Sequence, residues 1–267
     1  MNILDKIVEY KRKETEVRKH HYPIASLEQS AYFERATHSM KKELLREDKH
    51  GIIAEFKRKS PSRGEINFKA NIEGTSLGYI KAGASGLSIL TDDYFFGGRN
   101  QDLIDARSLN ACPILRKDFI LDEYQIIEAK SIGADVILLI AAILDPWQLK
   151  EFCSLAHSLH LEVLMEIHDE DEMRNNEDAN VDLIGVNNRN LKTFEVSANV
   201  SKRLSEIIPA SAIKISESGI DSPEAIIELK KFGFRGFLMG QTFMEKDDPE
   251  REATDFISRL ALMTKNQ

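Results

Sequence analysis

The chain has 267 residues, of which 42% are hydrophobic and 30% charged, and its formal net charge is −8. This composition is typical of a globular protein with a substantial core, and the acidic balance argues against nucleic acid as a bulk partner. No apolar run approaches the roughly 20 residues that span a membrane, and the charged N-terminal stretch lacks a secretory signal. Cys112 and Cys153 lack the spacing of a zinc site or a disulfide framework. We therefore expect a cytoplasmic protein with no membrane partner.

The N-terminal part of the chain predicts a helical extension. Its apolar positions recur at helical spacing and are Ile3, Leu4, Ile7 and Val8. Ser26 is a candidate N-cap for a second helix. Two interpretations remain open, namely a solvated arm and a lid over a binding site. Because no Gly- or Ser-rich linker follows, we expect one domain over residues 1–267, with an extension at 1–48 and the main fold at 49–267.

From residue 51 onward, short apolar runs alternate with longer amphipathic ones. The expected strands are 52–57, 86–91, 113–118, 135–141, 161–167, 182–188, 212–218 and 235–240. Several helix candidates between them begin with Asp or Ser and finish near Gly, as helix caps prefer. This alternation predicts a parallel sheet, and eight such units favour a closed (β/α)₈ TIM barrel. A doubly wound open sheet is the alternative, although its GxGxxG motif is absent after the first strand.

Polar residues stand where the expected strands end, which is where barrel enzymes carry their reactive groups. In chain order they are Glu55, Lys57, Asp92, Lys117, Asp118, Glu166, Asn187, Arg189, Glu217, Ser218 and Gly240. Strand alternation places Glu55 and Lys57 on the same face as Ile53, so we expect both charges to point inward at the mouth. An inward charge is costly unless it is paired, which favours a polar substrate there. Each residue alone is also compatible with a solvated loop, and Lys57 could simply pair with Glu55.

A phosphate site is indicated by loops that would be neighbours in a closed barrel. Its candidates are Ser60, Ser218, Gly219, Gly240, Gln241 and Thr242. Barrel enzymes often bind phosphate with the loops after strands seven and eight, and glycine lets the backbone approach an anion closely. The seven histidines show no metal-ligand spacing, so we expect no metal site. We interpret His168, which follows Glu166 by two positions, as a polar loop histidine.

Several long segments in this order match a known family. They are "IIAEFKRKSPSRGEI", "LSILTDDYFFGG", "PILRKDFILDEYQI", "LEVLMEIHDEDE", "IGVNNRNLKTFEV" and "ISESGI". Over essentially its whole length the chain resembles indole-3-glycerol-phosphate synthases of tryptophan biosynthesis, in a form without a neighbouring phosphoribosylanthranilate isomerase domain. The resemblance implies a carbon–carbon lyase without cofactor or metal. It would convert 1-(2-carboxyphenylamino)-1-deoxyribulose 5-phosphate into indole-3-glycerol phosphate, carbon dioxide and water.

The resemblance also implies roles for individual residues. Lys117 would protonate the ketone oxygen as the aromatic carbon attacks, Lys57 would contact the carboxylate, and Glu166 would act as acid and base around dehydration. The residues that orient these groups or complete the polar ring would be Glu55, Asn187, Arg189, Glu217 and Ser218. The phosphate contacts would be Ser60, Gly219, Gly240 and Gln241. The apolar wall around the anthranilate ring would be Phe96 and Leu138.

The chemistry sets one further expectation for Lys117. Ring closure needs a proton for a developing alkoxide, and we expect a neighbouring lysine and partial burial to lower the pKa of Lys117. After the eighth strand the family usually has Gly-Glu-Ser or Gly-Ser-Ser, whereas this chain has Gly240, Gln241 and Thr242. That change keeps the backbone donors and alters the side chain at position 241.

Two rival functions stay open at this point. One is another phosphate-binding barrel enzyme, such as a sugar-phosphate isomerase, which would not need two lysines flanking a carboxylate. The other is a catalytically silent barrel that binds a phosphorylated ligand or a protein, and the presence of Lys57, Lys117 and Glu166 argues against it. For the assembly we expect a monomer or a weak homo-oligomer with a small phosphorylated molecule as its partner.

Overall fold

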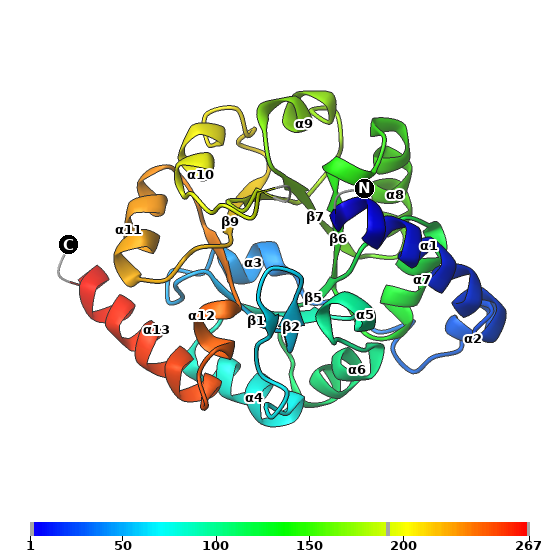
Figure 1. The fold of residues 1–267 in the computed structure, drawn as a ribbon, viewed down its shortest axis with the longest axis horizontal. Helices are drawn as coiled ribbons and strands as arrows, with labels where there is room; N and C mark the ends of the chain where they lie inside the picture. The colour runs from blue at the N-terminus through cyan, green and yellow to red at the C-terminus, as the bar shows by residue number, and fades with distance from the viewer. Residues whose placement is uncertain (1–2, 191–192, 266–267) are drawn as a thin grey trace.

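The computed structural model describes residues 3–190 and 193–265 and folds them into a closed barrel (Figure 1). Its strands are β1 (Ile52–Phe56), β4 (Gly86–Leu90), β5 (Ile114–Lys117), β6 (Val136–Ile140), β7 (Glu162–Ile167), β8 (Leu183–Asn187), β9 (Ile213–Glu217) and β10 (Gly236–Met239). They are parallel, each pairs with the next, and β1 pairs with both β4 and β10. Because the ring closes, the predicted TIM barrel is confirmed and the open sheet is excluded. Each strand lies within one residue of its predicted bounds.

Helices surround the strands on the outside of the ring (Figure 1). They are α4 (Ile72–Ala82), α6 (Asn100–Leu109), α7 (Glu123–Ser131), α8 (Pro146–Ser158), α9 (Glu170–Asn175), α10 (Asn199–Leu204), α11 (Pro223–Lys231) and α13 (Pro249–Lys265). Three short helical turns instead follow strand ends, namely α5 (Asp93–Phe96), η1 (Ala141–Ile143) and α12 (Gln241–Met244). Side-chain caps fix several starts, as Asp145 accepts a hydrogen bond from the backbone N–H of Gln148. The predicted Asp and Ser caps are therefore present at α7, α8 and α11.

The core has two layers because successive strand residues point to opposite faces. The inner layer fills the barrel with Ile53, Leu115, Val136, Leu138, Leu164, Leu183, Ile215 and Leu238. The outer layer lies between strands and helices and includes Ala54 and Phe56. Ile53 is therefore inward, and Glu55 shares its face near the end of β1. The predicted alternation of β1 is confirmed.

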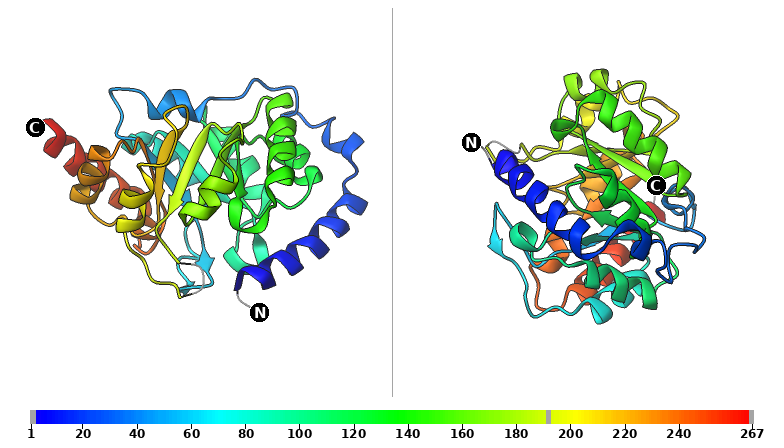
Figure 2. Two further views of the ribbon diagram at one scale, coloured as in Figure 1. Left: turned by 90° about the horizontal axis from the view of Figure 1, so that it is seen from above. Right: turned by 90° about the vertical axis from the view of Figure 1, so that its right-hand side faces the viewer.

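A short hairpin follows β1 that the sequence did not predict. It joins β2 (Lys59–Ser60) to β3 (Gly64–Glu65). Figure 2 shows it projecting beyond the barrel on the side where the strands end. The Ser-Pro-Ser-Arg-Gly turn is therefore part of a two-stranded flap that brings Ser60 and Ser62 to the rim of the mouth pocket.

The N-terminal extension contains α1 (Ile3–His21), α2 (Ile24–Leu27) and α3 (Met40–Leu44). The interpretation of Ser26 as a helix N-cap is wrong, since Pro23 precedes α2 and the Ser26 hydroxyl donates to the carbonyl of Pro23. Three predicted apolar residues of α1, namely Ile3, Leu4 and Ile7, line a pocket at the strand ends. That contact favours the lid over the solvated arm.

The same extension also closes the opposite end of the barrel. Met40 and Leu44 of α3 belong to the inner core layer. A side chain at Gly86 would collide with Met40, and the backbone N–H of Met40 donates to Glu162 at 2.8 Å. Because Gly86 and Glu162 begin β4 and β7, α3 lies at the start of the strands. Figure 2 shows α1 and α3 at opposite ends of the barrel.

No helix within the described residues is both long enough and apolar enough to cross a membrane.

Candidate active site

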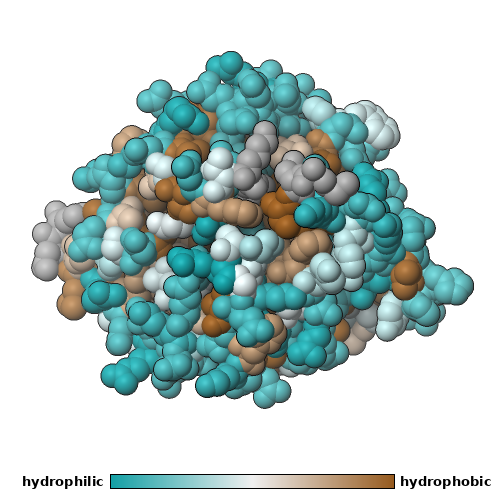
Figure 3. All heavy atoms as spheres, in the orientation of Figure 1, coloured by the Kyte–Doolittle hydropathy of each residue, from teal (hydrophilic) through white to brown (hydrophobic). Residues whose placement is uncertain are grey.

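One pocket at the carboxyl ends of the strands collects all but one of the site residues that the sequence singled out, the exception being Asp92. Its lining includes Glu55, Lys57, Ser60, Phe96, Lys117, Leu138, Glu166, Asn187, Arg189, Glu217, Ser218, Gly219, Gly240 and Gln241. Figure 3 shows the mouth face, where apolar residues gather around the middle and hydrophilic residues dominate the periphery. The fold therefore brings these residues together from all around the barrel, as parallel strands that end on one side require.

Lys117 lies at the centre of the polar ring, between two carboxylates. Its ammonium is 2.8 Å from Oε2 of Glu166 and 2.7 Å from Oε2 of Glu217. Burial opposes the charge of Lys117, but these two carboxylates outweigh it, so the pKa of Lys117 is raised. The expected lowering of this pKa by a neighbouring lysine is therefore wrong. Lys57 does not contact Lys117 and instead pairs with Glu55 at 2.7 Å.

Glu166 is held by donors on both carboxylate oxygens. Lys117 contacts Oε2, and the amide of Asn187 donates to Oε1 at 3.1 Å. Burial alone would raise the pKa of Glu166, but Lys117 and His168 overcome that effect and lower it to about 2. Asn187 in turn accepts from the backbone N–H of Arg189 at 3.0 Å, which fixes its amide orientation. Glu166 is therefore ionised, and contacts on both oxygens fix its orientation.

Glu217 differs from Glu166 although both contact the same ammonium. Burial is the largest influence, and together with the charge of Glu166 it raises the pKa of Glu217 to about 7 despite Lys117. Its Oε1 atom is buried and has no hydrogen-bond partner within the part of the chain that the structure describes. A Cβ at Gly185 would lie 2.1 Å from this oxygen, so the glycine makes room for the carboxylate. The two carboxylates therefore share one ammonium unequally.

Glu55 and Lys57 form a second pair on the wall made by β1. Besides Lys57, Glu55 accepts a hydrogen bond from Ser88 at 3.3 Å. A Cβ at Gly240 would lie 2.6 Å from Oε1 of Glu55, so this position must stay small. The structure contains the Lys57–Glu55 pair that was one of the open alternatives. Both groups nevertheless line the pocket, where a substrate carboxylate can compete for the ammonium.

The loops after β9, β10 and β1 contribute Ser218, Gly219, Gly240, Gln241 and Ser60 to one part of the pocket, called the recess below. Ser218 and Gly219 both have positive φ, 69° and 70°. Arg189 reaches the same region, where its Nη2 donates to the Gln241 side chain at 3.4 Å. The Thr242 hydroxyl points away and donates to the carbonyl of Ile220 at 2.8 Å. Gln241 therefore lines the recess, while Thr242 braces the loop.

Some pocket residues were missed by sequence reasoning. Phe119, Ile140 and Phe194 join Phe96 and Leu138 in the apolar part of the lining, and the rings of Phe96 and Phe119 lie 5.8 Å apart. The position of Phe119 directly after the Lys117-Asp118 pair was an available signal. Phe194 lies on a loop, and no sequence signal pointed to it.

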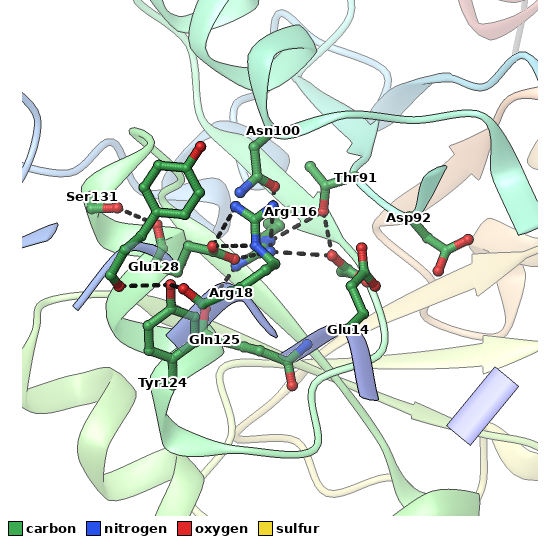
Figure 4. Close-up of polar contacts among 12 residues, drawn as sticks. Glu14, Arg18, Thr91, Asp92, Asn100, Arg116, Tyr124, Gln125, Glu128 and Ser131 are labelled. Carbon is green, nitrogen blue, oxygen red and sulfur yellow. Dashed lines mark hydrogen bonds and ion pairs between the residues drawn. The ribbon is translucent and has the colours of Figure 1, made fainter. Parts of the chain in front are cut away.

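A buried ion network anchors α1 over the pocket. Lys11 lies 2.9 Å from both Asp92 and Asp118, and all three side chains are buried. Figure 4 shows the adjoining group, in which Arg18 of α1 and Arg116 of β5 both meet Glu128. The expectation for Asp92 is corrected here. It caps α5 and pairs with Lys11 instead of facing the mouth.

Among the described residues, no group of three or more His, Cys, Asp or Glu side chains is arranged to hold a metal ion.

Comparisons with known proteins place the chain in one family. Residues 4–256 match the family model of indole-3-glycerol phosphate synthase. Relatives described by that name include a protein of Bacteroides thetaiotaomicron, 46% identical over 97% of this chain and 99% of its own length. Another, from Bacillus cereus, is 42% identical over 91% of this chain and 92% of its own. Among solved structures, a chain of the tryptophan synthase complex of Pyrococcus furiosus has a TM-score of 0.57 at 14% identity. It covers 80% of this chain and 98% of its own, a likeness of fold alone.

Proposed function

The chain belongs to the indole-3-glycerol phosphate synthase family and has the carboxy-lyase activity of that family in tryptophan biosynthesis, and we propose that the mouth pocket performs it. The observation that supports this most is the position of Lys117, which is buried at the pocket centre with Glu166 and Glu217 against it. The substrate is 1-(2-carboxyphenylamino)-1-deoxyribulose 5-phosphate.

Lys117 acts as the general acid of ring closure. Because its pKa is raised, it carries its proton throughout the neutral range. When the aromatic carbon attacks the ketone carbon, the ketone oxygen becomes an alkoxide, which is basic enough to take a proton even from a strongly held ammonium. The substrate oxygen must first take one of the two hydrogen bonds that Lys117 makes to carboxylates. The carboxylate that loses its bond is Glu217, because it holds its negative charge less readily.

Lys57 and Glu166 act in the later steps. The ammonium of Lys57 leaves Glu55 to bind the substrate carboxylate, and the apolar lining receives the carbon dioxide when the C–C bond breaks. Dehydration then needs a proton for the departing hydroxyl and a base for the remaining carbon-bound proton. Lys57 supplies the first, and Glu166 accepts the second because its lowered pKa keeps it ionised.

The phosphate occupies the recess made by Ser60, Arg189, Ser218, Gly219, Gly240 and Gln241. Support comes from the positive φ of Gly219 and from the guanidinium of Arg189 beside it in the pocket lining. Arg189 binds a dianion well because its planar fork matches two oxygens. The anthranilate ring then lies against Phe96 and Leu138, beneath Ile3, Leu4 and Ile7 of α1.

The direct test is to add the substrate and follow indole fluorescence at several pH values, with a chelator present throughout. We expect product to form with the chelator, since no cofactor or metal is assigned. Absence of signal at every pH would refute the assignment of the pocket. A dephosphorylated substrate that turns over equally well would show that the recess has been assigned the wrong ligand.

Location and assembly are also proposals. The two cysteines are buried and free, which supports a reducing, cytoplasmic setting. We propose a monomer or a weak homo-oligomer, and sedimentation at several protein concentrations distinguishes these from a stable assembly.

A further inference from the structure

His168 lies directly behind Glu166, and both of its ring nitrogens face carboxylates. Nδ1 is 3.2 Å from Oε2 of Glu172, which also accepts the backbone N–H of His168 at 2.7 Å. On the other side, Nε2 is 3.4 Å from Oε1 of Glu166. The ring is largely buried, and Nε2 has no hydrogen-bond partner in the described part of the chain.

This arrangement decides the charge of the ring. A neutral imidazole carries a proton on only one nitrogen and presents a lone pair on the other. With a carboxylate on each side, either neutral tautomer would place that lone pair against a negative oxygen. Only the imidazolium carries an N–H on both nitrogens, one donated to Glu172 and the other with its positive charge 3.4 Å from Glu166, so two flanking carboxylates favour the charged ring.

We propose that His168 is a positioning residue that stays positively charged between Glu172 and Glu166 and keeps Glu166 ionised and turned toward Lys117. It does not itself line the pocket, so it acts through Glu166 and not on the substrate. This inference rests on the proposed function only for its effect on turnover. The charge state of the ring is independent of any reaction.

The electrostatic surroundings agree with this role. Burial alone would lower the pKa of His168, but Glu172 and Glu166 outweigh it, so the pKa is raised. Two further charged residues of the polar ring, one acidic and one basic, bear on His168 as well. Glu217 adds a smaller favourable contribution, and Lys117 shares Glu166 with the histidine. The charged residues that share a surface hollow with His168 are Asp169, Glu172, Arg189, Glu195 and Arg203.

Two variants separate charge from position. His168→Gln can still offer an amide N–H to Glu166 but carries no charge, and His168→Phe removes both. His157→Gln is the matched control. His157 also pairs with a carboxylate, Asp182 at 2.9 Å, but at the start of β8, on the far end of the barrel.

The experiment is a carboxyl ¹³C and ring ¹⁵N titration of the labelled full-length protein, together with the pH dependence of kcat. We expect a doubly protonated His168 ring at pH 7.5, where a free histidine with pKa about 6.5 is mostly neutral. In His168→Gln the titration of Glu166 and the acid limb of kcat should both move up by roughly one to three pH units, because an opposite charge at this distance shifts a pKa that much. KM should change little, and His157→Gln should leave both curves in place.

Each result bears on the proposal. A neutral ring at pH 7.5 overturns it, and so does a charged ring whose removal leaves the titration of Glu166 unmoved. If the wild-type protein forms no indole product, the proposed function fails, while the two NMR titrations still decide the role of His168. His168→Phe shows whether orientation adds to charge, since it should lower kcat more than His168→Gln at a pH where Glu166 is ionised in both.

Discussion

The ammonium of Lys117 lies 2.7 Å from Oε2 of Glu217, a carboxylate that holds its negative charge poorly. The same ammonium is 2.8 Å from Glu166, which is firmly ionised. One ammonium therefore pairs with two carboxylates, one whose pKa is raised and one whose pKa is lowered. Pairs of titratable groups whose surroundings push their pKa values apart are typical of sites that move protons.

Lys117→Met should retain the side-chain length and lose the proton. Because a general acid acts mainly in the transition state, we expect kcat to fall roughly 10²- to 10⁴-fold or more with a small change in KM. Lys117→Arg keeps the charge but holds its proton too tightly to donate it, so it should also be severely impaired. Both are measured at saturating substrate by indole fluorescence.

Lys214→Met is the matched control for these variants. Lys214 is a partly buried lysine near the start of β9, away from the mouth, where it donates to the carbonyl of Ser205. It should turn over normally. Near-normal turnover of Lys117→Met would remove Lys117 from the mechanism, and activity in Lys117→Arg alone would reduce its role to that of an electrostatic anchor.

The two carboxylates should affect stability with opposite dependence on pH. Glu217 has a folded-state pKa raised from 4.5 to about 7, so its stabilising contribution is complete below pH 4.5 and is lost as pH rises to about 7. Glu166 has a pKa lowered from 4.5 to about 2, so its contribution is present above pH 4.5 and is lost as pH falls toward 2.

Thermal unfolding measured from pH 2 to 4.5 and from pH 4.5 to 7 tests the direction of both effects on stability. Relative to wild type, Glu217→Gln should gain in Tm as pH rises from 4.5 to 7, because the glutamine has no charge to bury. Relative to wild type, Glu166→Gln should lose in Tm as pH rises from 2 to 4.5, because the glutamine cannot ionise. Parallel Tm curves for wild type and Glu217→Gln would show that Glu217 titrates normally.

The strands and the grouping of the site residues were predictable because both depend on short-range pattern. Alternation fixed the inward face of β1, and the rule that strand ends meet on one side brought Glu55, Lys117 and Glu166 together. The pKa of Lys117 was not predictable. It depends on which acid, Glu166 or Glu217, lies within hydrogen-bond distance, and sequence gives no distances between strands.

The sequence also did not predict that the N-terminal extension covers both ends of the barrel. Met40 and Leu44 sit in a short apolar pattern without distinguishing features, and only the fold shows that they fill the start of the barrel. Nothing in the sequence around Lys11 distinguishes it from the other charged residues of α1. Its burial depends on Asp92 and Asp118, which come from loops far away in the chain. His168 is the polar loop residue that was expected, between β7 and α9, but its two carboxylate neighbours, Glu166 and Glu172, were not predictable because they enclose it only after folding.

Gly219→Ala should weaken binding of the phosphate end of the substrate. The glycine has φ of +70°, and an added Cβ would lie 2.2 Å from Val196, so the loop must move. We expect KM to rise roughly 10- to 100-fold, because a hydrogen bond to a charged group contributes about 1.5–3 kcal/mol. Gly233→Ala has similar backbone strain, with φ of +84°, at the far end of α11 and should leave KM unchanged.

Sulfate gives an independent measure of the same recess. It should raise the apparent KM of the wild-type enzyme and affect Gly219→Ala much less. If sulfate inhibits both equally, or if the two glycine variants behave alike, the anion lies elsewhere.

Lys11→Met should loosen α1 from the barrel. The change leaves Asp92 without its ammonium and Asp118 with Arg116 alone, and breaking a buried pair costs roughly 3–5 kcal/mol. Tm should therefore fall and KM should rise, since α1 forms part of the pocket lining. Lys13→Met is the control, because Lys13 is exposed and its one ion pair within residues 3–190 and 193–265 is with Glu9. Equal Tm and KM in the two variants would show that the buried network does not hold α1.

Two truncations should distinguish the role of α1, which covers the pocket, from that of α3, which closes the start of the barrel. Removing residues 1–22 deletes α1 and leaves Met40 and Leu44 in the inner core layer. That variant should keep a cooperative unfolding transition and show a raised KM, because a mouth without its lid admits water and orders the substrate poorly.

Removing residues 1–45 also takes away α3 and opens the start of the barrel, so it should lose the transition. The proposal of one domain over residues 1–267 predicts this difference, which circular dichroism during heating measures. Equal cooperativity in both variants would mean that α3 is dispensable, and unfolding of the shorter truncation would mean that α1 belongs to the folding core.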